Sequence, residues 1–341
     1  MDKQESREIG LRSEGVTVAI CVPVRDEAAA LPSLLDALAG LDRRGLAVTF
    51  CCYLDSCTDA SEALLRAAPV RVEVGPMRAD ANAGRARAAA MAMGLATVGY
   101  EAGALLLSTD ADSRPRSDWL QAACAALAVA DVAAGRIECD RVDARQVRVE
   151  RYYDRLHGYR RAVDPVPWEA GGCHHAGGAN LAVRADVYHA LGGFLPLPAG
   201  EDARLLDDAA RAGFRVRHDP AMAVETSARR IGRVPGGLAT SLDALAANGL
   251  PRVQHPAAAA WQYARHALAR AMFARGDWAA VGQAVGLSAD HVLGVARDCP
   301  NAEAFAMRIV PAAPDAARLV PLAEAERALA ALELALCRGA A

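Results

Sequence analysis

The chain has 341 residues, of which 38 are basic and 41 are acidic, so its formal net charge is −3 at pH 7. This length allows one large α/β domain or a domain with a helical extension, and the charge excludes long-range attraction to nucleic acid. Nine cysteines are scattered without a Cys-x-x-Cys pair, which predicts reduced thiols in a cytoplasmic protein. Residues 1–14 form a polar tail without a signal-peptide pattern, and no apolar stretch approaches the ~20 residues that span a bilayer.

The first part of the chain alternates apolar, β-branched runs with helical patterns. We expect strands over residues 16–22, 47–54, 70–74 and 104–108, and helices over 28–41, 61–68, 81–97 and 119–130. This alternation predicts an open, mostly parallel α/β sheet flanked by helices, which binds ligands at the carboxyl ends of its strands.

Acidic loops follow three of the predicted strands, at residues 25–27, 55–59 and 108–113. The last reads STDADS and places Asp110 and Asp112 two residues apart, so that in an extended backbone both carboxylates point to one side. Two such anions repel each other unless a cation lies between them. The spacing therefore indicates a divalent metal next to phosphate chemistry, although Asp is common enough for chance to supply it.

Beyond residue 130 the alternation stops. Residues 141–161 form a basic helical stripe that is either a solvated face or a contact for an anionic or membrane-surface acceptor. Its arginines are Arg141, Arg145, Arg148, Arg151 and Arg155. Residues 171–180 (GGCHHAGGAN) are too rich in glycine for a helix or central strand, which suggests backbone packed against a ligand.

Three further segments follow. We expect a strand over 181–184, a helical turn over 186–191 and a helix over 201–212 that opens with Glu201 and Asp202, which could simply cap it. Residues 226–237 hold three arginines in a glycine-bounded loop that suits a diphosphate or is surface charge. After residue 238 the chain is Ala-rich and helical, with a helix over 289–297 capped by Ser288 and a last one over 321–337.

The order and spacing of these motifs resembles the family 2 glycosyltransferases of the GT-A fold, from about residue 16 to 237. The motifs are VPVRDE (22–27), LDSCTDAS (54–61), AGRARAAAMA (83–92), STDADSRP (108–115), GGANLAVRAD (177–186), GGF (192–194), GED (200–202) and SARRIGRVPGG (227–237). The resemblance implies a GT-A domain over 15–237, with a nucleotide half at about 15–115 and an acceptor half at about 116–237. A flexible tail (1–14) precedes it, and a helical extension (238–341) follows.

The resemblance also implies transfer of one sugar from a nucleoside-diphosphate sugar to an acceptor hydroxyl, with inversion and with Mn²⁺ or Mg²⁺. Carried onto this sequence, Asp112 would hold the cation, Asp110 would face the ribose or the metal's water shell, and Asp202 would be the catalytic base beside Glu201. His218 is either a third metal ligand or a plain surface histidine.

The remaining roles concern the nucleotide and the acceptor. The nucleoside pocket would use Pro23, Arg25 and Glu27, the base would bond Asp55, and Arg85 or Arg87 would lie near the base or the phosphates. The diphosphate clamp would be Arg229, Arg230 and Arg233. His174 and His175 could line the acceptor site.

Departures from the family pattern leave other readings open. Leu54 replaces the first of two common aspartates, and Cys57 stands where Ser is common. The Q-x-x-R-W signature and membrane helices of processive members are missing, so we expect a soluble enzyme, with peripheral membrane contact possible. The acceptor (a lipid, saccharide or small metabolite) and any homo-oligomer stay open.

Three rival functions are weighed against this one. A sugar-phosphate nucleotidyltransferase needs a Gly-rich loop with Lys after the first strand, where this chain has Ala28, Ala29 and Ala30. A Rossmann dehydrogenase needs G-x-G-x-x-G there. A non-catalytic nucleotide-sugar binder does not require both Asp112 and Asp202.

Overall fold

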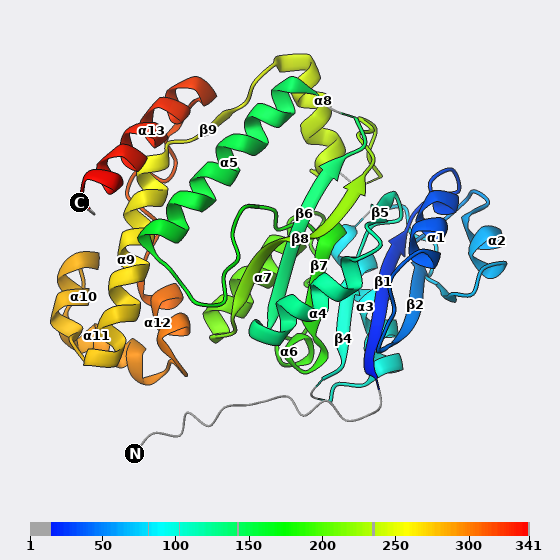
Figure 1. The fold of residues 1–341 in the computed structure, drawn as a ribbon, viewed down its shortest axis with the longest axis horizontal. Helices are drawn as coiled ribbons and strands as arrows, with labels where there is room; N and C mark the ends of the chain where they lie inside the picture. The colour runs from blue at the N-terminus through cyan, green and yellow to red at the C-terminus, as the bar shows by residue number, and fades with distance from the viewer. Residues whose placement is uncertain (1–14, 81, 102, 142, 234–235, 340–341) are drawn as a thin grey trace.

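The computed structural model describes residues 15–80, 82–101, 103–141, 143–233 and 236–339, and its main feature is an eight-stranded mixed sheet (Figure 1). The strand order is β3-β2-β1-β4-β7-β6-β8-β5. The strands are β1 (Val16–Val24), β2 (Leu46–Leu54), β3 (Arg71–Val74), β4 (Leu105–Ser108), β5 (Ser113–Pro115), β6 (Val132–Cys139), β7 (Leu181–Arg184) and β8 (Val216–Thr226). The first four are mutually parallel, β7 runs antiparallel to β4 and β6, and β8 is parallel to β6. The predicted α/β class with an open, mostly parallel sheet is confirmed. The predicted tail lies outside the described residues.

Helices cover both faces of this sheet because the central strands are apolar on both sides. Val18, Ile20 and Val22 of β1 pack against α1 and α4, whereas Ala19 and Cys21 face α3. Gly94 allows α3 to approach closely, since a Cβ there would lie 2.4 Å from Cys21 Sγ. The helices of this part are α1 (Leu31–Ala39), α2 (Ser61–Arg66), α3 (Ala83–Val98), α4 (Trp119–Val129), α5 (Ala144–Val163), α6 (Ala185–Ala190) and α7 (Glu201–Ala212).

Strands β5, β6 and β8 were not expected from the sequence. In β6, Gly135 has no room for a side chain, because a Cβ would lie 2.3 Å from the Nδ2 of the buried Asn180. The register between β6 and β8 shifts at that point, and Asn180 Nδ2 donates to the freed carbonyls of Arg136 and Met222 at 2.8 and 2.9 Å. Asn180 therefore completes the hydrogen bonding at an irregularity in the sheet. This gives a structural role to one residue of the glycine-rich segment 171–180.

The C-terminal part packs beside α5, which runs between the sheet and α9 and α13 (Figure 1). Its elements are α8 (Leu238–Asn248), β9 (Arg252–Gln254), α9 (Pro256–Arg275), α10 (Trp278–Val285), α11 (Ala289–Arg297), α12 (Ala302–Ile309), β10 (Leu319–Pro321) and α13 (Leu322–Gly339). Ser288 caps α11 as predicted, its Oγ accepting from His291 N–H at 3.2 Å. Among the described residues, none of the helices has the length and apolar character needed to cross a bilayer.

The basic stripe on α5 is partly consumed by this packing. Arg148 bonds Glu326, with its Nη2 2.5 Å from Oε2, and Arg155 bonds Glu333 at the same distance two helical turns further on. These two arginines hold α13 against α5, so they are not a free surface for an anionic acceptor.

Candidate functional site

The predicted acidic loops lie together, because β2, β1 and β4 are adjacent parallel strands whose carboxyl ends share one edge. Arg25 Nη1 lies 3.1 Å from Oδ2 of the buried Asp55, which ties the first loop to the second. Asp26 has a positive φ of 50°, and its Oδ1 accepts from Thr58 N–H at 2.6 Å. The loops after β1 and β2 are thus fixed to each other by side-chain bonds.

Arg229 joins this edge to the loop after β8. Its Nη2 lies 2.6 Å from Glu27 Oε1 and 3.2 Å from Asp112 Oδ2. Arg233 Nε lies 3.4 Å from the same Glu27 oxygen. Two of the three arginines predicted to clamp a diphosphate therefore converge on Glu27, and Arg229 also reaches the predicted metal ligand Asp112.

The surroundings of Asp112 hold more negative charge than Arg229 neutralises. Burial and the neighbouring Asp110 raise the pKa of Asp112 from its ordinary 3.8 to about 6, with Glu27 adding to the rise and Arg229 opposing it. A buried carboxylate with a raised pKa is poorly compensated, and a bound cation would compensate it.

Arg87 is buried at the centre of the site and joins four groups. Its guanidinium donates to Glu201 Oε1 at 3.0 Å, Ser108 Oγ at 2.8 Å, the Gly178 carbonyl at 2.9 Å and Asp110 Oδ1 at 2.9 Å. Burial opposes the charge of Arg87, but Asp110 and Glu201 outweigh it and raise its pKa. Gly178 must be glycine for this, because a Cβ would lie 2.3 Å from the guanidinium carbon.

Helix α7 places Glu201 and Asp202 at its first turn, after Gly200 in the left-handed conformation (φ 77°). Glu201 is buried on Arg87, and burial raises its pKa although Arg87 opposes the rise. Asp202 is directed differently, since its Oδ2 accepts from Gly178 N–H at 2.8 Å. Both residues line the larger cavity described below, but Asp202 is only partly buried, whereas Glu201 is buried against Arg87.

Two neighbouring cavities connect these groups. One of about 390 Å³ is lined by Arg87, Asp110, Asp112, Asp202 and Arg229, among others, and by the start of α8. The other, of about 380 Å³, is lined by Glu27, Asp112, Arg229 and Arg233. Asp112 and Arg229 border both, so the predicted donor and base residues surround one continuous region.

Three predicted residues lie elsewhere. Arg85 pairs with Asp80 at 3.0 Å, away from the phosphate region. Arg230 is exposed and lines a separate cavity with Arg141. Pro23 is half-buried within β1.

The expectation that His218 could be a third ligand of the Asp112 metal needs correction. His218 pairs with Ala134 of β6, five residues before Cys139, which pairs with Thr226 beside Ser113; five residues of strand span roughly 17 Å. His218 is buried, its Nδ1 lies 3.3 Å from Glu169 Oε2, and its ring lies 4.6 Å from that of His157. The family resemblance allowed His218 a place beside the metal, but β8 places it near the end of the strand that lies away from Asp112.

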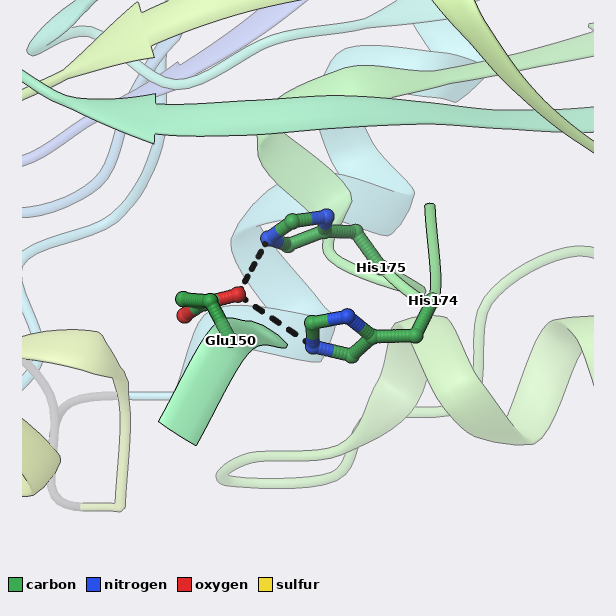
Figure 2. Close-up of side chains that lie close together, drawn as sticks. All are labelled: Glu150, His174 and His175. Carbon is green, nitrogen blue, oxygen red and sulfur yellow. Dashed lines mark ion pairs between the residues drawn. The ribbon is translucent and has the colours of Figure 1, made fainter. Parts of the chain in front are cut away.

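His174 and His175 lie at Glu150 on α5, beside a third cavity of about 620 Å³ (Figure 2). Glu150 was not singled out in the sequence. Ser108 was missed as well, although it ends the strand before STDADS and bonds Arg87.

The residues at Asp112 fit a divalent cation of the Mg²⁺ or Mn²⁺ type. Such ions are bound by one or two carboxylates, and substrate phosphates and water complete the shell. Within the described part of the chain, no third carboxylate or imidazole approaches Asp110 and Asp112 closely enough to complete a protein cage. A cation there would depend on the phosphates of its ligand.

No protein-family profile and no curated protein matches the chain. Among the solved structures with a similar backbone are the following three. Residues 1–349 of S. aureus TarS with UDP-GlcNAc match at 16% identity and a TM-score of 0.48, covering 85% of this chain and 89% of that one. Mannosyltransferase PcManGT from Pyrobaculum calidifontis with GDP-Man and Mn²⁺ matches at 18% identity and a TM-score of 0.46. The match covers 94% of this chain and 87% of that one. Glucosyl-3-phosphoglycerate synthase from Mycobacterium tuberculosis with Mn²⁺, UDP-Glc and phosphoglyceric acid matches at 18% identity and a TM-score of 0.45. The match covers 70% of this chain and 81% of that one.

Proposed function

We propose that the chain is a GT-A glycosyltransferase that moves one sugar from a nucleoside-diphosphate sugar to an acceptor hydroxyl, with a divalent cation and with inversion. The observation that carries the proposal is the meeting of Asp112, Arg229 and Asp202, from three distant segments, around one cavity. A cation ligand, an arginine and a separate carboxylate base are what direct displacement of a diphosphate requires.

The donor diphosphate would enter between Asp112 and the two arginines of the loop after β8. Arg229 and Arg233 each carry several N–H donors in a planar fork, which suits phosphate oxygens. The cation, when bound, supplies positive charge opposite the leaving diphosphate. Arg25 and Asp55, tied together at 3.1 Å, would border the nucleoside.

The acceptor would be activated by Asp202. In the proposed step, the acceptor hydroxyl oxygen forms a bond to the anomeric carbon of the sugar, while the bond from that carbon to the diphosphate oxygen breaks. The diphosphate leaves with the electron pair, and the hydroxyl proton passes to the Asp202 carboxylate. One displacement on the face opposite the leaving group inverts the sugar carbon.

The proposal is tested by thermal unfolding with UDP, GDP, dTDP and CDP, each with and without Mn²⁺. We expect one nucleotide to raise the unfolding temperature only when Mn²⁺ is present, and we expect Asp112→Asn to lose that rise. If no nucleotide stabilises the protein in a metal-dependent way, the donor site does not exist. If binding is intact but the matching nucleotide sugar is never turned over, the chain is a binding protein instead.

A further inference from the structure

The segment between α5 and β7 brings three potential metal ligands together on the side of the sheet where α5 lies. Glu150 comes from the second turn of α5, and His174 and His175 come from the glycine-rich segment that passes over it. Figure 2 shows one carboxylate oxygen of Glu150 facing a ring nitrogen of each histidine.

The two distances from Glu150 match a tetrahedral ion, and the three ligand atoms all lie within 4.8 Å of one another. Glu150 Oε2 lies 3.0 Å from His175 Nε2 and 3.3 Å from His174 Nε2. An ion bound at about 2.0 Å by imidazole and carboxylate ligands separates those ligand atoms by about 3.3 Å, from tetrahedral geometry. The Glu150 oxygen is itself buried and has no hydrogen bond of acceptable geometry, and neither has His175 Nδ1. The three side chains therefore lie close together, but their buried polar atoms are not all hydrogen-bonded.

A further carboxylate orients one of the histidines. His174 Nδ1 lies 2.8 Å from Asp154 Oδ1, and Asp154 also accepts the His174 backbone N–H at 3.1 Å. Asp154 stands one turn after Glu150 on α5 and is fixed by Arg136 at 3.3 Å. A carboxylate on Nδ1 leaves Nε2 as the nitrogen that faces Glu150, which is the arrangement found around metal-bound histidines.

One side of the cluster is open. Glu150, Asp154 and His175 line the cavity of about 620 Å³, and Ile137 lines both that cavity and the one that holds Asp202. Three protein ligands with an open fourth position are typical of zinc sites that bind water or a substrate oxygen.

A second His-Glu-His group, His157, Glu169 and His218, fits an ion less well. It is buried, and Glu169 Oε1 already accepts backbone N–H groups from His218 at 2.8 Å and Gly171 at 3.3 Å. His157 Nε2 lies 3.8 Å from Glu169 Oε2.

We propose that Glu150, His174 and His175 bind a divalent transition-metal ion of the zinc class, with its fourth position open to the cavity of about 620 Å³. This site is separate from the donor cation at Asp112 and does not depend on the proposed sugar transfer. The ion would offer its open position to an oxygen of the molecule that enters this cavity.

The test uses the full chain, stripped with a chelator and titrated with Co²⁺ in the absence of nucleotide. Tetrahedral Co²⁺ absorbs visible light much more strongly than the octahedral, oxygen-bound ion expected at Asp112. We expect one equivalent of strongly absorbing Co²⁺, displaced by Zn²⁺. Glu150→Gln and His175→Ala should abolish the band, and Asp154→Asn should weaken affinity by about 10–100-fold.

Matched variants separate this site from the others. His218→Ala, Asp112→Asn and the exposed His291→Ala should all keep the band. Circular dichroism of each apo variant checks its fold, and His175→Ala serves if Glu150→Gln does not fold. The proposal is overturned if the native chain gives no tetrahedral band, or if the band survives in Glu150→Gln or His175→Ala or disappears in His218→Ala.

Discussion

Arg87 is the residue that holds the two sides of the candidate site in place, because one buried guanidinium bonds Asp110 at the end of β4 and Glu201 at the start of α7. Arg87→Met would leave a buried carboxylate and the Gly178 carbonyl without their donor. We expect a loss of about 3–5 kcal/mol in the free energy of unfolding, as is usual when one partner of a buried pair is removed.

Chemical denaturation measures this loss. The control is Arg85→Met, two residues earlier, whose partner Asp80 is largely exposed; we expect a change of about 1 kcal/mol or less there. Equal effects of the two substitutions would contradict the central position of Arg87.

Asp202 and Glu201 are neighbours in the sequence, but we expect opposite consequences from changing them. Asp202→Asn keeps the size of the side chain and removes the base, so nucleotide binding should persist while transfer falls by about 10²–10⁴-fold. Glu201→Gln breaks the pair with Arg87 and should lower stability first. Transfer assays beside thermal unfolding distinguish the two, and near-normal turnover in Asp202→Asn would refute its role.

Asp112 should make the stability of the free protein depend on pH. Its pKa in the folded chain, about 6, exceeds the ordinary 3.8, so the folded state binds the proton more tightly. The resulting stabilisation is complete below about pH 4 and is lost as the pH rises through about 6.

The Asp112→Asn variant has no carboxyl group to ionise here, so its stability should not fall in this way as the pH rises. Without metal at pH 8 it should be more stable than the native chain by up to about 3 kcal/mol, from roughly two pKa units. Denaturation at pH 4 and pH 8 checks this, because the difference between the two proteins should appear only at the higher pH. A variant that is less stable than the native chain at pH 8 would contradict the raised pKa.

At the scale of elements, the sequence predicts those helices and strands that a local pattern of residues determines. Strand β1 and helix α7 follow from their own apolar periodicity and turn signals. Strand β6 could not be found this way, because Ala133, Ala134 and Gly135 favour no strand. The glycine is required by contacts with Asn180 and with the Met222 carbonyl, both of which lie far away in the sequence. The acidic loops could be predicted because each follows a strand that its own apolar pattern identifies. The position of His218 could not be predicted, because nothing in the sequence gives the length of β8.

The contact between α5 and α13 also depends on distant residues. Arg148 and Arg155 meet Glu326 and Glu333, but all four side chains are partly exposed, so each pair contributes about 0.2–1 kcal/mol. We expect Arg148→Glu with Arg155→Glu to loosen α13, and the added changes Glu326→Arg and Glu333→Arg to restore it. Hydrogen exchange in α13 measures the loosening, and failure of the fourfold reversal to restore protection would show that the pairs do not fix the helix.

At the scale of the whole molecule, residues 238–341 are built into the rest of the chain. Tyr152 of α5 is buried against Val253, Val320, Leu322 and Leu329, and Arg270 bonds Asp164 at the end of α5. The start of α8 also lines the cavity that holds Asp202.

A chain that ends at residue 237 should therefore unfold at lower temperature and bind nucleotide more weakly. The sequence predicted only a helical extension that follows a domain ending at residue 237. Thermal unfolding with nucleotide and Mn²⁺ compares the two lengths, and unchanged stability and binding in the shorter chain would show that the extension is separable.

The position of Arg229 has a thermodynamic consequence for the proposed reaction. In the structure its guanidinium is shared between Glu27 and Asp112, so it already has anionic partners before any donor arrives. A cation that binds Asp112 releases part of Arg229 for a phosphate, and a phosphate that draws Arg229 away exposes Asp112 to a cation. Each ligand then raises the affinity of the other by the same factor, as linkage requires. The cation and the donor would thus enter as a cooperative pair, and neither would hold the site alone.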